Sequence, residues 1–293
     1  MRRIALALVA LAWGCTEEPA FEPPRPAITT EPPVAAPTAS ERPPSPPCGH
    51  PTPLDVHHDA AGRVDRLHAT LVARGIEGKF LVDTGALRSY ATHTGVPEES
   101  KNADTVLDCK AMTFPIIARP NAMTTPNGEP RRGVLGADLL RHGAVFDFDL
   151  RAGTLRWYEP PPPPPAGAVV LPVEYRKGWL IASGIEVDGR DVKLVIDTGA
   201  TNVIIIDKVP RPGEVREDIL DGTASPVTLY NGEGDVAFVG GAPRRVPVSR
   251  SDDFPTLQGL IQDLGGDVAG LLGITSLGTE RIVLGREALY VML

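Results

Sequence analysis

Two copies of the tripeptide Asp-Thr-Gly are the residues in this sequence most able to do chemistry, one at 83–85 and one at 197–199. Each copy ends a run of apolar, β-branched residues, and each is followed by alanine, Ala86 in the first copy and Ala200 in the second. A single copy is ordinary turn sequence, because Asp and Gly both favour turns. Two copies in matched contexts indicate that Asp83 and Asp197 act together.

The chemistry of such a pair follows from its electrostatics. Two carboxyl groups about 3 Å apart cannot both ionise, so the pair shares one proton and offers an acid and a base at once. One group would activate a water molecule, and the other would hydrogen-bond the carbonyl of the bond being cut, without a covalent enzyme intermediate. A matched pair of aspartates could therefore supply the acid and the base of a hydrolase.

The elements that position these residues occur twice in the same order. Each half predicts a strand hairpin, the Asp-Thr-Gly loop, a variable middle, a Gly-x-Leu-Gly turn with a short helix, and a closing hairpin. This repeat, with many Gly and Pro and few aromatic residues, favours a mostly β fold. The corresponding segments are 78–90 and 192–205, 132–140 and 269–277, and 144–158 and 280–292.

The repeated FLVDTGA and LVIDTGA segments, with their Gly-x-Leu-Gly turns, resemble the retropepsin-like aspartic peptidases over about residues 64–292. The resemblance implies two tandem β-barrel lobes of the acid protease type, forming a pseudo-twofold pair with the active site between them. It implies that Asp83 and Asp197 are the catalytic pair. It also implies that Thr84 and Thr198 hydrogen-bond across the site and that Gly85 and Gly199 let the two loops approach. It also implies an aspartic endopeptidase that acts on peptides or proteins.

The residue after each Asp-Thr-Gly affects the expected pH range. It is alanine in both halves, so neither Ala86 nor Ala200 supplies a hydroxyl that would stabilise the ionised pair. The upper pKa of the pair should then be less depressed than with Ser or Thr, and activity should extend toward neutral pH.

A flap over the site is predicted in the second half only. Asn231-Gly232, flanked by alternating residues, is a strong hairpin signal, and Tyr230 would lie near the tip. The alternative for Tyr230 is an ordinary surface position on a strand. The first half has strands expected at 104–110 and 112–119 with no comparable turn, so its flap is expected to be reduced or missing.

The N-terminus predicts export. Residues 1–15 combine two arginines with a short apolar stretch, which is typical of a signal peptide. Gly14-Cys15 resembles a bacterial lipoprotein signal, in which Cys15 would be lipidated, and ordinary secretion with Cys15 removed is the alternative. We expect a cell-envelope lipoprotein, periplasm-facing or in the outer membrane.

Composition sets the remaining boundaries. Residues 16–53, rich in Pro, Ala, Glu and Thr, predict a disordered tether. A poly-Pro linker at 159–168 separates lobe 1 (54–158) from lobe 2 (169–293). The chain has 293 residues with a net charge of −8 and no run of basic residues, which argues against nucleic-acid binding.

The remaining motifs give weaker evidence about structure and function. Cys48 and Cys109 could pair in an oxidising compartment, and two buried free thiols are the alternative. The histidines lack metal-ligand spacing, so we expect no metal site and no cofactor. Asp147 and Asp149 alternate with aromatic residues and are expected to point to solvent.

Three hypotheses for function remain at this stage. The first is a monomeric peptidase whose two lobes pair within one chain, with membrane contact only through the lipid anchor. The second is a catalytically silent module that binds a peptide or envelope ligand. The third is a protease assembled by lobe pairing between chains.

Overall fold

The computed structural model describes residues 51–73, 76–92, 102–108, 110–117, 124–140, 144–158, 162–220, 225–278 and 280–292. Strands dominate these residues, and their pairings include a closed barrel, so the expected mostly β class is confirmed. The predictions for the signal segment at 1–15, for lipidation of Cys15 and for a bond between Cys48 and Cys109 lie outside the described residues. So does most of the expected tether.

The first half begins earlier than expected. Strand β1 starts at Thr52, so the last two residues assigned to the tether belong to the fold. Thr52 pairs with Leu155 and Pro53 with Thr154, which gives this end of the chain a strand partner. The first-half elements are β1 (Thr52–His58), β2 (Val64–Ala73), β3 (Ile76–Val82), β4 (Tyr90–Thr92), β5 (Asn102–Leu107), β6 (Lys110–Ile117), β7 (Arg131–Leu135), the 3-10 turn η1 (Ala137–Leu140), β8 (Val145–Asp149) and β9 (Thr154–Tyr158).

The second half follows the proline-rich segment and has a longer middle. Strand β15 (Pro226–Phe238) is longer than β5, and strand β14 (Val215–Leu220) and helix α1 (Pro255–Asp263), whose Leu257 and Leu260 are buried, have no counterpart among the described residues of the first half. The second-half elements are β10 (Val169–Arg176), β11 (Trp179–Val187), β12 (Arg190–Asp197), β13 (Val203–Ile206), β14 (Val215–Leu220), β15 (Pro226–Phe238), β16 (Arg244–Ser251), α1 (Pro255–Asp263), β17 (Gly270–Gly273), the 3-10 turn η2 (Ile274–Leu277), β18 (Arg281–Leu284) and β19 (Ala288–Met292).

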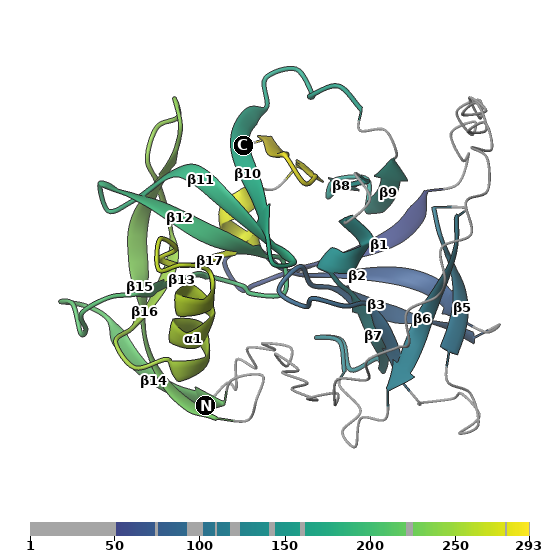
Figure 1. Cartoon of the computed structure of the whole chain (residues 1–293), viewed down its shortest axis with the longest axis horizontal. Coiled ribbons are helices and arrows are strands. Elements are labelled where there is room, and N and C mark those ends of the chain that lie inside the picture. The colour runs from purple at the N-terminus through teal and green to yellow at the C-terminus, as the bar shows by residue number, and fades with distance from the viewer. Residues whose placement is uncertain are drawn as a thin grey trace, which may run out of the picture.

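The same strand pairing occurs twice around the two Asp-Thr-Gly segments. β3 pairs antiparallel with β2 and parallel with β7, while β4 pairs antiparallel with β7 and parallel with β6. In the second half, β12 pairs with β11 and β17, and β13 with β17 and β16, in the same senses. Figure 1 shows the two sets on opposite sides of the molecule. β3 and β12, which lead into the two aspartates, are therefore flanked by a strand on each side.

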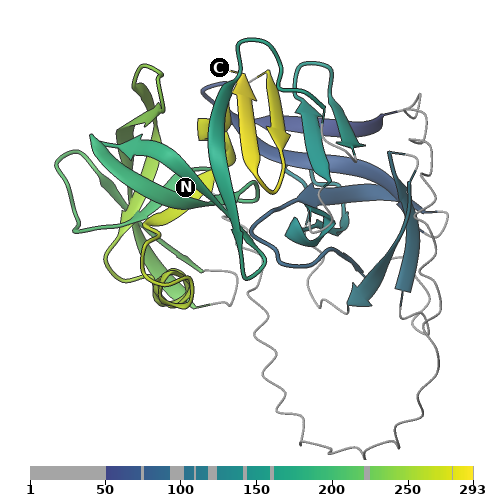
Figure 2. The ribbon, with the colours of Figure 1, turned by 45° about the horizontal axis from the view of Figure 1, so that its top comes forward.

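Strands from both halves also share one sheet. Its order is β1, β9, β8, β18, β19, β10, and the two halves meet where β8 pairs with β18. Figure 2 shows the β18–β19 hairpin, in yellow, between β10 and the β8–β9 hairpin. Buried Phe146 and Phe148 on β8 and Ile282 and Leu284 on β18 belong to one apolar core. The chain thus joins its halves through backbone hydrogen bonds and a common core.

The expectation that Asp147 points to solvent is wrong. Its side chain is buried, and its two carboxylate oxygens accept hydrogen bonds from Arg281 Nε (2.7 Å) and Arg281 Nη2 (2.5 Å). The alternation of aspartate and aromatic residues along β8 could not indicate this ion pair, because Arg281 lies 134 positions further along the chain. Asp149, at the end of β8, accepts a hydrogen bond from the backbone N–H of Ala152 (2.7 Å).

Two histidines lie together on the paired strands β1 and β2. The rings of His57 and His68 make an edge-to-face contact, with 4.9 Å between centroids. His68 is buried, and neither of its ring nitrogens has a hydrogen-bond partner among the described residues. Burial, together with the nearby His57, Arg131, Arg66 and Lys79, lowers the pKa of His68 to about 3.

No described helix has the length and apolar character needed to cross a membrane.

The pairing of Asp147 with Arg281 predicts a loss of stability when the arginine is removed. Arg281→Met strands a buried carboxylate and should lower the free energy of unfolding by about 2 to 4 kcal/mol, measured by urea denaturation. Arg151→Met, which removes an exposed arginine between β8 and β9, is the control and should change little. A double variant that adds Asp147→Asn should recover part of the loss. Equal stabilities for Arg281→Met and the control would contradict the pairing.

The neutral His68 predicts a stability that falls with acidity. Its pKa in the folded state is below the ordinary 6.5, so the unfolded chain binds a proton first as the pH drops below 6.5. At pH 5 this linkage costs roughly 2 kcal/mol relative to pH 7, and the loss continues toward pH 3. His68→Leu should remove this part of the pH dependence in urea denaturation, whereas His58→Leu, at an exposed position, should keep it. Parallel stability curves for His68→Leu and the unmodified chain would refute this assignment.

Candidate active site

The structure brings the two predicted catalytic residues together. Asp83 follows β3 and Asp197 ends β12, and their exposed fractions are 2% and 3%. A Cβ atom added to Gly85 would lie 2.5 Å from Cγ of Asp197, and one added to Gly199 would lie 2.5 Å from Cγ of Asp83. Each carboxyl group therefore lies against the glycine of the other loop, and a side chain at either glycine would displace it.

Crossed hydrogen bonds hold the two loops together. The N–H of Thr84 donates to Oγ1 of Thr198, and the N–H of Thr198 donates to Oγ1 of Thr84, both at 3.1 Å. Each hydroxyl in turn donates to a backbone carbonyl of the opposite half, Thr84 to Ile196 (2.7 Å) and Thr198 to Val82 (3.0 Å). All four groups are buried, so each bond satisfies atoms that water cannot reach. The predicted cross-bonding of the threonines is present in the structure.

The Gly-x-Leu-Gly turns support the loops from behind. The N–H of Ala137 donates to the carbonyl of Ala86 (2.8 Å), and the N–H of Ile274 donates to the carbonyl of Ala200 (2.9 Å). In the first half a further link is present, because Ser89 Oγ donates to Oδ1 of Asp138 at 2.7 Å. The backbone carbonyls of Ala86 and Ala200 thus hold the two loops against the turns, and no polar side chain is needed at these positions for this contact.

The two aspartates differ in their surroundings. Burial raises the pKa of Asp83 well above its ordinary range, and the charge of Asp197 raises it further. Burial also raises the pKa of Asp197, but a hydrogen bond with Asp83 opposes the rise. Oδ1 of Asp197 accepts the N–H groups of Gly199 (2.9 Å) and Ala200 (3.1 Å), which also favour its ionised form. Oδ2 of Asp83 is buried without a hydrogen-bond partner in the described part of the chain. The two backbone N–H groups on Asp197 favour its ionised form, and the stronger rise in pKa at Asp83 favours its protonated form.

The predicted hairpin turn at Asn231-Gly232 is wrong. Both residues lie inside β15, and so does Tyr230, which pairs with Arg216 of β14 and Arg250 of β16. Asn231 is held from both sides, since its amide donates to Glu217 (2.6 Å) and its carbonyl accepts from Ser249 (2.6 Å). Neighbouring strands on both edges keep the strand extended and override the local turn preference. The three residues are therefore not at a flap tip.

Sequence reasoning missed a polar contact beside the aspartates. Arg66 of β2 is buried and contacts the hydroxyl of Thr201, four residues after Asp197. A charged residue inside the mostly apolar run of β2 is a signal that could have pointed to a special position. Its partner could not be read from the sequence, because it lies 135 positions away.

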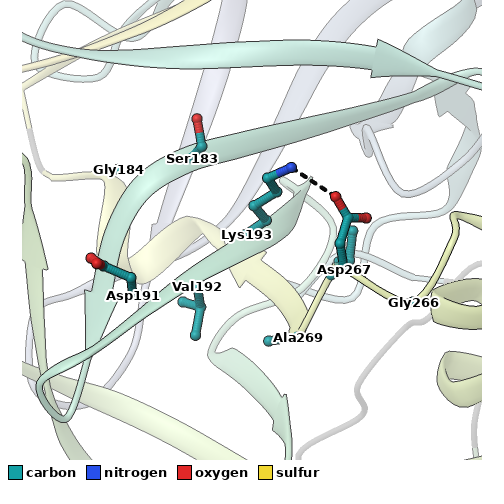
Figure 3. A pocket seen from close by; sticks show the side chains of 9 residues that line it. Ser183, Gly184, Asp191, Val192, Lys193, Gly266, Asp267 and Ala269 are labelled. Carbon is teal, nitrogen blue, oxygen red and sulfur yellow. Dashed lines mark hydrogen bonds and ion pairs between the residues drawn. The ribbon is translucent and has the colours of Figure 1, made fainter.

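A separate hollow lies on the second half, away from the two aspartates. It has a volume of about 510 Å³ beside β12 and is lined by three charged residues, Asp191, Lys193 and Asp267, of which the last two pair with each other at 2.7 Å (Figure 3). Ser183 lines it with no histidine among its neighbours there, so the hollow offers no nucleophile and base. Among the described residues, no group of three or more His, Cys, Asp or Glu side chains could hold a metal ion.

No protein-family model matches the sequence, and no curated protein matches it.

The crossed threonine bonds predict which substitutions the site tolerates. Thr84→Val removes the hydroxyl and leaves the carbonyl of Ile196 and the N–H of Thr198 buried without their partner. It should lower the free energy of unfolding by about 2 to 4 kcal/mol, measured by urea denaturation. Thr84→Ser, which keeps the hydroxyl, should lose less than about 1 kcal/mol. If serine and valine cost the same, the hydroxyl contributes nothing at this position.

Proposed function

We propose that this protein is an aspartic endopeptidase with a retropepsin-like arrangement, in which each half of the chain forms one lobe and contributes one catalytic aspartate. The observation that carries the proposal is the reciprocal geometry of the two Asp-Thr-Gly loops, in which each carboxyl lies against the opposite glycine and the threonines cross-bond. The repeated strand pairing on either side supports the same assignment.

The different surroundings of the aspartates divide their roles. Asp197, ionised and held by two backbone N–H groups, acts as the general base that removes a proton from the attacking water. Asp83, which carries the shared proton, donates it to the carbonyl oxygen of the scissile peptide bond as the tetrahedral intermediate forms. Collapse of that intermediate transfers a proton to the departing amine and returns the pair to one shared proton. No covalent bond to the enzyme forms at any stage.

Pairing of both halves within one chain is the form of the site that we propose. The crossed threonine bonds and the pairing of β8 with β18 join the two halves of the same chain. They support a monomer over an assembly in which lobes exchange between chains. The proposed substrates are peptides or proteins outside the cytoplasm, reached from an exported and membrane-tethered chain.

The working pH of the proposed enzyme should lie above that of strongly acidic peptidases. The pair is buried, it has alanine at both following positions, and the pKa of each aspartate is raised. Raised pKa values move both limbs of the pH–rate profile upward, because the active form carries one proton on the pair. The cost of protonating His68 also disfavours acid conditions.

Peptide cleavage tests the proposal. The purified protein should cut an unstructured peptide library between pH 3 and 8, with activity that extends toward neutral pH. Asp83→Asn and Asp197→Asn should each lower kcat/KM by about a thousandfold or more, because each removes one member of the proton-sharing pair. Asp253→Asn, which removes the same charge at an exposed position, should leave cleavage unchanged.

Three outcomes would each contradict one part of this proposal. Absence of cleavage at every pH by folded protein would favour the silent binding module. Recovery of activity when the two inactive variants, Asp83→Asn and Asp197→Asn, are mixed would favour lobe pairing between chains. A profile confined below about pH 4 would contradict the pH argument alone.

A further inference from the structure

Arg66 places a fixed positive charge where the two halves meet. Its side chain is 7% exposed, and Nη1 donates to the backbone carbonyl of Asp65 (2.8 Å) and lies 3.2 Å from the Asp65 carboxylate. The same Nη1 contacts Oγ1 of Thr201 in the other half. The Thr201 hydroxyl donates to Oδ1 of Asp65 at 2.8 Å, which closes a three-residue cluster. The guanidinium is thereby clamped beside the loop that carries Asp197.

The corresponding position in the second half carries no charge. His68 pairs with Leu81, two residues before Asp83, and Ile181 pairs with Val195, two residues before Asp197. Counting back two residues along β2 and β11 makes Trp179 the counterpart of Arg66.

Trp179 matches Arg66 in strand register, and its surroundings are apolar. It is buried in an apolar cluster against which Leu87 packs, and Leu87 is four residues after Asp83. Each half thus contacts the residue four positions after the aspartate of the other half. Arg66 makes a polar, cationic contact with Thr201, whereas the cluster around Trp179 makes an apolar contact with Leu87.

This asymmetry matters because the two carboxyl groups are buried and repel each other. The positive charge of Arg66 lowers the pKa of both Asp83 and Asp197, against the rise that burial causes. Ala86 and Ala200 offer no hydroxyl to the pair, so a nearby cation is one of the few groups that can favour its ionised form. Asp65 offsets part of the charge of Arg66, and the nearby His68 stays neutral above pH 3 or so.

We propose that Arg66 is a positioning residue for the Asp83–Asp197 pair: clamped by Asp65 and Thr201, its guanidinium stabilises the ionised carboxylate from one side of the site. The kinetic consequence rests on the proposed peptidase function, whereas the effect on ionisation does not. In this assignment Arg66 acts through the charge that it holds beside the pair.

The ionisation of the pair tests the inference without any need for activity. Carbon-13 labelling of aspartate carboxyl groups allows the titration of Asp83 and Asp197 to be followed by NMR, with Asp83→Asn and Asp197→Asn to assign the signals. Arg66→Gln should move both titrations upward by roughly half a pH unit to one unit. Arg66→Lys keeps the charge and should recover most of this shift. Arg245→Gln, which removes an exposed arginine of β16, should leave the titrations in place.

The pH–rate profile provides the second measurement. Both limbs should move upward in Arg66→Gln by the same amount as the titrations, and Arg66→Lys should lie near the unmodified protein. If Arg66→Gln shifts the titrations but the unmodified protein cleaves no peptide, the role proposed for Arg66 is supported and the peptidase function is refuted. If folded Arg66→Gln cleaves peptides and both its pH–rate profile and its titrations are unchanged, the proposal for Arg66 is wrong. The peptidase proposal is then unaffected.

A second variant covers the case in which Arg66→Gln does not fold. Thr201→Val releases one end of the clamp without a change of charge, so the guanidinium is less firmly held. It should move both titrations in the same direction by a smaller amount. Unchanged titrations in folded Thr201→Val together with a failure of Arg66→Gln to fold would overturn the proposal, since Arg66 would then act only in folding.

Discussion

Two mutually repelling carboxyl groups, buried next to each other, impose the constraint on which the rest of this structure depends. Their desolvation, and their repulsion when both are ionised, favour separation of the loops that carry them. The threonines oppose this, because their crossed hydrogen bonds tie each loop to the backbone of the other half. Gly85 and Gly199 are required for the same reason, since any side chain there would occupy the space of the opposite carboxyl. The uncharged threonines and glycines thus permit and hold the close approach of the pair.

The strands around the loops explain how this contact is maintained. Each aspartate lies at the end of a strand flanked on both sides, and each loop is bonded from behind to a Gly-x-Leu-Gly turn. The shared sheet adds a second attachment between the halves at β8 and β18, where Asp147 and Arg281 pair. The halves are therefore joined both at the carboxyl pair and along this sheet, and relative movement would have to break buried hydrogen bonds at both places.

The two halves share a pattern but differ in chemistry. The second half has the longer middle, with β14, β15 and α1, and its aspartate accepts two backbone N–H groups. The first half supplies Arg66, whereas the matching position in the second half is Trp179. A pair built from two identical chains would have the same group on both sides. Here one chain can assign the proton to one aspartate and the charge to the other, because each position is free to vary separately.

The sequence by itself determined the mostly β class, the repeat, and the residues of the candidate pair, because local composition and internal similarity carry that information. It also indicated the role of the threonines and glycines, through the resemblance of the repeated motif. Only the tertiary structure decided the partners of Asp147 and Arg66, since both partners lie more than a hundred positions away. The same holds for Asn231-Gly232, where strands on both sides outweigh a local turn preference. Local sequence can specify what a segment prefers, but which groups meet across the fold depends on how the whole chain packs.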